Sequence, residues 1–206
     1  MTPDLGFIHR FVPATGSGRP PLLLLHGTGG DEHDLVPFGE AVAPGAALLS
    51  PRGPVIERGM PRFFGRLAEG VFDPAEIRRR THALGAFVEA ARAAYGLAAP
   101  VALGFSNGAN VAAALMLLRP GCLAGAALLR PMDVLGDPPA GRHPTPVLMV
   151  SGAADPLVSP IDLDGLAHRL SEGGAEVERQ ILPTGHNLAP RDGALVAAWL
   201  GRHFPA

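Results

Sequence analysis

Short apolar runs recur along the chain, and they constrain its fold more than any other feature. Seven of them are strand candidates: 7–12, 21–25, 46–50, 101–105, 125–129, 147–151 and 177–182. From the second onward most are continuously apolar, which is typical of strands buried on both faces of a parallel sheet. Helical patterns alternate with them, at 35–43, 77–95, 107–118, 161–171 and 193–203. This alternation predicts a three-layer α/β fold, with a mostly parallel sheet of about seven strands and helices on both faces.

Length and composition favour a single folded domain over residues 1–206. Apolar residues make up 47% of the chain, its net charge is −2 and only 17% of its residues are charged, whereas disordered chains are poor in apolar residues and rich in net charge. No basic patch indicates nucleic-acid binding, no apolar run reaches the ~18 residues of a membrane span, and no secretory signal is expected from the first residues. The single cysteine, Cys122, excludes an internal disulfide, so we expect a cytoplasmic location.

A serine lies in the setting of a nucleophile elbow. Gly104-Phe105-Ser106-Asn107-Gly108 matches G-x-S-x-G between a predicted buried strand and a predicted buried helix. In such an elbow the chain reverses tightly, and glycines omit Cβ atoms that would collide across the turn. The helix that follows presents backbone N–H groups beside the serine. The sequence therefore predicts Ser106 as a nucleophile, the alternative being a glycine-rich turn in which Ser106 only caps the helix.

An activated serine needs a base, and the base needs an orienting carboxylate. In this setting the chain order is serine, acid, histidine. Asp155 follows the strand 147–151 and His186 follows the strand 177–182, at the sheet edge where Ser106 emerges. Asp133 is the best rival acid, because it follows the preceding strand. The rival histidines precede the serine or lie on predicted helices or in a proline-rich connection: His9, His26, His82, His143, His168 and His203.

A glycine-rich turn after the strand 21–25 is the predicted oxyanion loop. His26-Gly27-Thr28-Gly29-Gly30 can point a backbone N–H at a developing oxyanion, a donor that needs no reorganisation. We predict the N–H groups of Thr28 and Asn107 as the oxyanion hole, the alternative being a plain tight loop. The chain has no lysine and no GxGxxG spacing here, which disfavours a phosphate loop. The acidic residues at 31–34 suit a first helical turn better than a metal site, so neither metal nor cofactor is expected.

The chain resembles the phospholipase/carboxylesterase family of serine α/β-hydrolases, which borders on the dienelactone hydrolases. The resemblance is carried by the elbow, by the glycine-rich turn, and by Gly152-Ala153-Ala154-Asp155-Pro156 and Gly185-His186-Asn187-Leu188. The resemblance spans most of the chain. It implies an α/β-hydrolase fold without a cap domain, hydrolysis of ester or thioester bonds, and Ser106, Asp155 and His186 as the catalytic triad. Dienelactone hydrolases carry a cysteine nucleophile, so a serine at this position disfavours dienelactone itself as the substrate.

Two connections bear on the substrate. Caps in this fold usually enter between the sixth strand and the acid-bearing strand, where this chain has only residues 130–146. We therefore expect an open site for a small-molecule ester with a small or medium acyl group. The connection 51–76 lacks a recognisable element, but its phenylalanines favour an ordered loop that forms part of the wall. The candidate lining residues are His33, Phe63, Phe64, Arg130, Met132 and Leu157.

Two other functions stay open at this point. One is a catalytically silent hydrolase-fold protein that binds a ligand, and the other is a peptidase or thioesterase on the same fold. No nucleic-acid partner and no membrane span are expected, and the sequence leaves a homodimer open.

Overall fold

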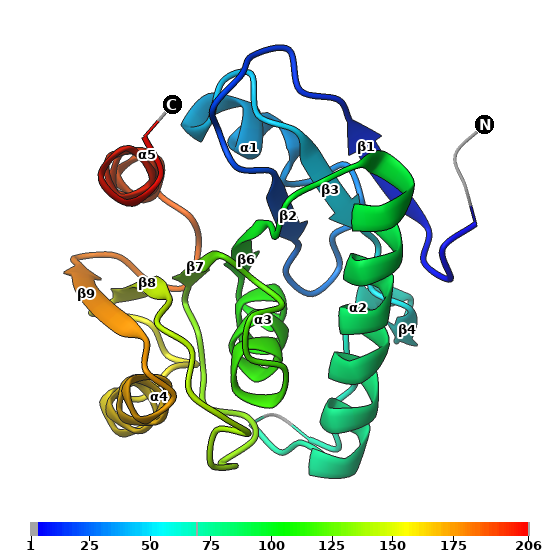
Figure 1. Ribbon diagram of the computed structural model, residues 1–206. Coiled ribbons are helices and arrows are strands. Elements are labelled where there is room, and N and C mark those ends of the chain that lie inside the picture. Colours follow the sequence, from blue (N-terminus) through cyan, green and yellow to red (C-terminus); the bar gives the residue numbers. More distant parts are fainter. Residues whose placement is uncertain (1–3, 69, 206) are drawn as a thin grey trace.

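A seven-stranded sheet forms the centre of the computed structural model, which describes residues 4–68 and 70–205 (Figure 1). The strand order is β1-β3-β2-β6-β7-β8-β9. The strands are β1 (His9–Val12), β2 (Leu22–Leu25), β3 (Leu48–Pro51), β6 (Val101–Phe105), β7 (Gly125–Leu129), β8 (Pro146–Gly152) and β9 (Glu176–Leu182). β1 runs antiparallel to β3, and the other pairs are parallel. The predicted α/β fold is thus confirmed.

Helices cover both faces of the sheet. They are α1 (Val36–Val42), α2 (Pro74–Tyr95), α3 (Asn107–Leu118), α4 (Pro160–Glu172) and α5 (Pro190–His203). Figure 1 shows α1 and α5 on one side of the sheet and α2, α3 and α4 on the other. Among the described residues, none of the helices combines the length and the apolar character needed to cross a bilayer.

The continuous apolar strands are explained by these two layers. Side chains alternate between the two faces of a strand. In β2, Leu23 and Leu25 pack into the core beneath α2, α3 and α4, whereas Leu22 and Leu24 pack into the core beneath α1 and α5. All four leucines are at most 1% exposed. A strand between two cores has no polar face, so its sequence cannot alternate.

The helix boundaries follow local signals. α2 begins three residues before its predicted start, because Pro74 occupies a first-turn position that tolerates proline. The carboxylate of Asp73 accepts a hydrogen bond from the Ala75 N–H and caps this end. The helix ends at Tyr95, and the next residue, Gly96, has a φ of 67°, the left-handed conformation typical of a glycine that follows a helix.

The connection 51–76 contains a hairpin that the sequence did not predict. β4 (Val55–Glu57) and β5 (Met60–Arg62) pair antiparallel around Arg58 and Gly59, which both have positive φ. Strands of three residues are too short to show a periodicity, which is why they were not recognised. The β7–β8 connection, residues 130–145, forms neither helix nor strand, so no cap domain is inserted there.

Candidate active site

Ser106 lies in a strained turn between β6 and α3. Its φ of 51° and ψ of −115° fall outside the regions that residues with a side chain ordinarily adopt. A Cβ on Gly104 would lie 2.6 Å from the carbonyl oxygen of Gly108, and a Cβ on Gly108 would overlap the carbonyl oxygen of Leu25. The turn therefore needs glycine at both positions. The Ser106 side chain makes no capping hydrogen bond to α3, contrary to the helix-cap alternative.

The hydroxyl of Ser106 is the first member of a chain of hydrogen bonds. Nε2 of His186 lies 2.8 Å from Ser106 Oγ, and Nδ1 of His186 lies 2.8 Å from Oδ2 of Asp155. The Asp155 side chain is 0% exposed and that of His186 is 21% exposed. With its proton on Nδ1, the imidazole donates to the carboxylate and accepts from the serine. The three residues come from loops after β6, β8 and β9, at one edge of the parallel sheet.

The rival groups lie elsewhere. Asp133 forms an ion pair with Arg169 of α4, and its Oδ1 accepts a hydrogen bond from the Gly136 N–H. Within the described residues, no rival histidine hydrogen-bonds to Ser106; those bonded to other groups are His9, His26, His143, His168 and His203. The geometry thus brings Ser106 together with Asp155 and His186.

Two of the residues beside Ser106 have backbone N–H groups that are free to bind a ligand. Thr28 and Asn107 both line the cavity beside Ser106. Neither of their backbone N–H groups donates a hydrogen bond within the described part of the chain. Unpaired N–H groups beside a nucleophile are suited to bind an oxyanion, because they need no reorganisation as charge develops.

The β4–β5 hairpin and Phe63, the residue that follows it, hold Thr28 and Asn107 in place. The Gly29 N–H donates to the carbonyl of Pro61 over 3.0 Å, and Nη1 of Arg62 donates to Thr28 Oγ1 over 2.6 Å. On the elbow, Oδ1 of Asn107 accepts from the Phe63 N–H over 2.7 Å. No local pattern predicts these contacts, because the partners lie more than 30 residues apart in the chain.

His26 ties the glycine-rich turn 26–30 to the connection that follows β3. Burial lowers the pKa of its imidazole, which keeps the ring neutral. Nδ1 lies 2.7 Å from the carbonyl oxygen of Gly27, and Nε2 accepts a hydrogen bond from the Gly53 N–H over 2.9 Å. Protonated Nε2 could not accept that bond, so the neutral ring is part of the loop structure. This agrees with a loop-packing role rather than a role as the base.

A cavity of about 280 Å³ lies beside Ser106. Its apolar wall comprises Phe72, Phe105, Met132 and Leu157. Its polar wall includes Thr28, Arg62, Arg66, Asn107, Asn110 and Asn187. Two of the six predicted lining residues, Met132 and Leu157, are therefore in place. Asn110 was missed although it follows Ser106 by four positions, the spacing that puts residues on one helix face.

The other four predicted lining residues do not reach the cavity. Phe63 and Phe64 are buried in the core and anchor the connection instead of forming its wall. Arg130 is also fully buried, because its side chain passes beneath the His186 loop. His33 is exposed and accepts a hydrogen bond from Nη1 of Arg10. These residues were predicted from their places in the chain, and such a place does not determine the direction in which a side chain points.

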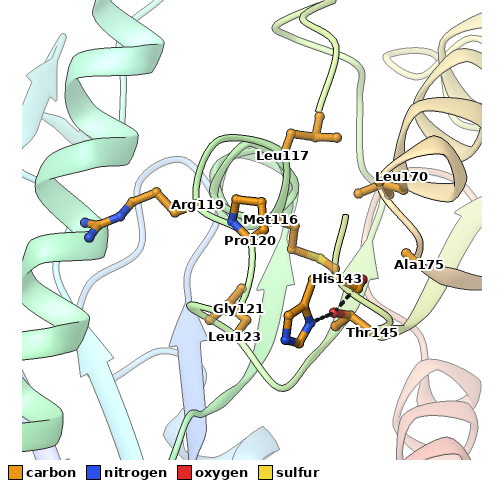
Figure 2. Close-up of a pocket in the computed structure, with 11 residues that line it drawn as sticks. Met116, Leu117, Arg119, Pro120, Gly121, Leu123, His143, Thr145, Leu170 and Ala175 are labelled. Atoms are coloured by element: carbon orange, nitrogen blue, oxygen red, sulfur yellow. Dashed lines mark hydrogen bonds between the residues drawn. The ribbon is translucent and has the colours of Figure 1, made fainter. Parts of the chain in front are cut away.

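A second cavity lies at the opposite edge of the sheet (Figure 2). It is bounded by the end of α3 and by the segments that lead into β7, β8 and β9. Figure 2 shows His143 beside it, hydrogen-bonded to Thr145. Its volume of about 20 Å³ is enough for about one water molecule. It is therefore too small for an organic substrate.

Known proteins resemble this chain over nearly its whole length, although no family model matches it. MhqD of Bacillus subtilis (strain 168), provisionally named as a hydrolase, is 38% identical over 187 residues, which cover 89% of this chain and 94% of MhqD. A carboxylesterase of Bacillus cereus has a TM-score of 0.94 at 37% identity, covering 98% of this chain and 96% of the other. A carboxylesterase from Mesorhizobium loti has a TM-score of 0.90 at 40% identity, covering 96% of both chains.

Proposed function

Because this chain belongs to the carboxylesterase family of α/β-hydrolases, we propose that it hydrolyses carboxylic esters of small to medium acyl groups through an acyl-enzyme on Ser106. The protein is a hydrolase of carboxylesterase type. The observation that carries the finer proposal is the chain of two 2.8 Å contacts that joins Asp155, His186 and Ser106. That chain ends at a cavity large enough for an ester.

The geometry supports the following mechanism. Ser106 Oγ attacks the ester carbonyl while Nε2 of His186 takes the hydroxyl proton. Asp155 holds the ring with Nδ1 protonated and stabilises the imidazolium that forms. The N–H groups of Thr28 and Asn107 bind the oxyanion of the tetrahedral intermediate. His186 then passes its proton to the departing alcohol, and a water molecule, activated by the same base, releases the acid from the serine.

The size and lining of the cavity favour small to medium acyl groups. Its volume of about 280 Å³ is near the lower end of the roughly 300–1,000 Å³ typical of ligand pockets. Phe72, Met132 and Leu157 offer an apolar surface to the substrate. Asn110 and Asn187 offer hydrogen-bonding groups, which suit a polar leaving group or a short acyl chain better than a long lipid.

Ser106→Ala tests the nucleophile. We expect this variant to lose its covalent adduct with a fluorophosphonate and nearly all turnover of nitrophenyl esters, leaving roughly 10³–10⁴-fold over the uncatalysed rate. Ser171→Ala is the matched control, because Ser171 is exposed on α4. Undiminished turnover by Ser106→Ala would disprove the assignment. A wild-type protein without an adduct at Ser106 would favour the ligand-binding alternative.

The acyl preference and the bond type need separate assays. A series of nitrophenyl esters of increasing acyl length should show the highest kcat/KM for short and medium chains. A preference for long chains would contradict the size argument. Matched ester, thioester and amide substrates then distinguish a carboxylesterase from a thioesterase or a peptidase on the same fold.

A further inference from the structure

Arg130 and Asp192 form an ion pair that is completely buried beneath the loop carrying His186. Both side chains are 0% exposed. Nη1 of Arg130 lies 2.8 Å from Oδ1 of Asp192, and Nη2 lies 2.9 Å from Oδ2, so the ion pair is bidentate. A buried ion pair is often no more stabilising than apolar side chains of the same volume, because removing both charges from water is costly. Stability alone is therefore a weak reason for this pair.

Nε and Nη2 of the guanidinium also bind the histidine loop, whereas Nη1 also donates to the carbonyl of Val150 over 3.4 Å. Nε of Arg130 donates to the carbonyl of Gly185 over 3.1 Å. The N–H of Nη2 that does not face Asp192 is shared between the carbonyl of Asn187, at 3.0 Å, and Thr184 Oγ1, at 3.3 Å. Gly185 and Asn187 are the two neighbours of His186 in the chain. The planar guanidinium thus fixes the backbone on both sides of the catalytic ring, as a single ammonium group could not.

Asp192 fixes the far end of the same loop. Its Oδ2 accepts a hydrogen bond from the Ala189 N–H over 2.7 Å, at the start of α5. On the other side, the Arg130 N–H donates to the carbonyl of Val150 in β8 over 2.7 Å. The ion pair therefore connects the carboxyl ends of β7 and β8 with the N-terminus of α5. The loop that carries His186 lies between these anchors.

The backbone of Arg130 is itself unusual. Its φ of 57° is a left-handed conformation that side-chain-bearing residues adopt rarely. Such conformations persist only where the surrounding contacts hold them. At this position the contacts are the bonds to Asp192 and to the histidine loop.

We propose that Arg130 and Asp192 are positioning residues that hold the His186 ring in line between Asp155 and Ser106. The proposal rests on the proposed function, in which His186 is the general base. The ring must reach partners on both sides over 2.8 Å, yet it is 21% exposed, so its own packing leaves it partly free. A displacement of about 1 Å at such a site can reduce the rate by roughly 100-fold.

A double variant separates positioning from stability. Arg130→Met alone leaves a carboxylate buried without its cation, so the protein should be destabilised. Arg130→Met/Asp192→Asn carries neither charge, and the side-chain amide oxygen at position 192 can still accept a hydrogen bond from the Ala189 N–H. We expect the double variant to have a higher Tm than Arg130→Met. Its kcat should nevertheless be about 100-fold below wild type, with KM little changed, at a temperature where circular dichroism shows full folding.

Leu84→Ala is the matched stability control. Leu84 is buried on α2, in the core on the opposite face of the sheet from α5. This variant should lose Tm but keep the wild-type kcat. Arg130→Lys should recover Tm more than kcat, because its ammonium can pair with Asp192 without reaching all the acceptors of the loop. A double variant with kcat within threefold of wild type would overturn the proposal.

A second readout does not depend on turnover. The Nδ1 proton of His186, held by Asp155, should give a low-field proton resonance in wild type and in Leu84→Ala, and the double variant should lose or shift it. If wild type shows this resonance but hydrolyses no ester, the proposed function fails and the resonance still tests the positioning role. If wild type is active and the double variant keeps both kcat and the resonance, the positioning role alone fails.

Discussion

The strained backbone of Ser106 leads to an inverted order of stability between two variants. Replacing alanine by glycine ordinarily destabilises a protein by about 0.5–1 kcal/mol, because glycine loses more backbone freedom on folding. At φ 51° and ψ −115°, however, any residue with a Cβ carries strain of order 1–3 kcal/mol, which glycine does not. We therefore expect Ser106→Gly to be more stable than Ser106→Ala, by about 1 kcal/mol after the two effects are subtracted.

The comparison isolates the backbone. Both variants lose the hydroxyl and with it the 2.8 Å contact with His186, so this loss cancels between them. The free energies of unfolding come from urea titrations followed by circular dichroism. Ala86→Gly is the control: Ala86 is exposed within α2, where glycine should cost about 1 kcal/mol. If Ser106→Gly is less stable than Ser106→Ala by a similar amount, the elbow carries no strain.

Four further variants test neighbouring features. Asp155→Asn should lower kcat by roughly 10⁴-fold. Asp133→Asn should leave kcat near wild type, because Asp133 pairs with Arg169. If steady-state kinetics show the larger loss of kcat for Asp133→Asn, Asp155 is not the catalytic acid. Gly108→Ala would push a Cβ into a backbone carbonyl oxygen and should cost at least the roughly 1–3 kcal/mol of an overpacked core, so a wild-type Tm would argue against this close approach. His26→Gln tests a pH dependence. Burial lowers the folded-state pKa of His26 below its unfolded value near 6.5, so below pH 6.5 the unfolded chain binds a proton that the folded chain does not. Wild-type stability should therefore fall, relative to the variant, as pH decreases from 7.5 to 5, with a limiting slope of about 1.4 kcal/mol per pH unit. A stability difference that is constant over this range would contradict a neutral buried ring.

The sequence predicted features that depend on pattern and chain order. A continuous run such as Leu22–Leu25 is compatible with a strand between two cores, and the order Ser106, Asp155, His186 follows from where strands end. Features that depend on side-chain direction were not predictable. Arg130 comes directly after β7, as a lining residue would. Its left-handed backbone nevertheless goes with a side chain that lies under the histidine loop rather than in the cavity.

Contacts between distant segments were equally hidden. Arg62 and Phe63 read as parts of an irregular connection, because three-residue strands carry no periodicity. Their hydrogen bonds to Thr28 and Asn107 arise only once the connection folds back over the sheet edge.

The proposed role of Thr28 makes that hairpin a place where activity can be lost without unfolding of the central sheet. β4 and β5 form a two-stranded sheet of their own, outside the central sheet, and such a hairpin depends for its stability on its contacts with the rest of the protein. Local opening of such a unit requires far less free energy than unfolding of the core. The seven-stranded scaffold could then keep the hydrogen-bonded chain of Ser106 and His186 aligned while the turn that carries Thr28 loosens. The lifetime of activity would accordingly be set by two short strands rather than by the sheet that defines the fold.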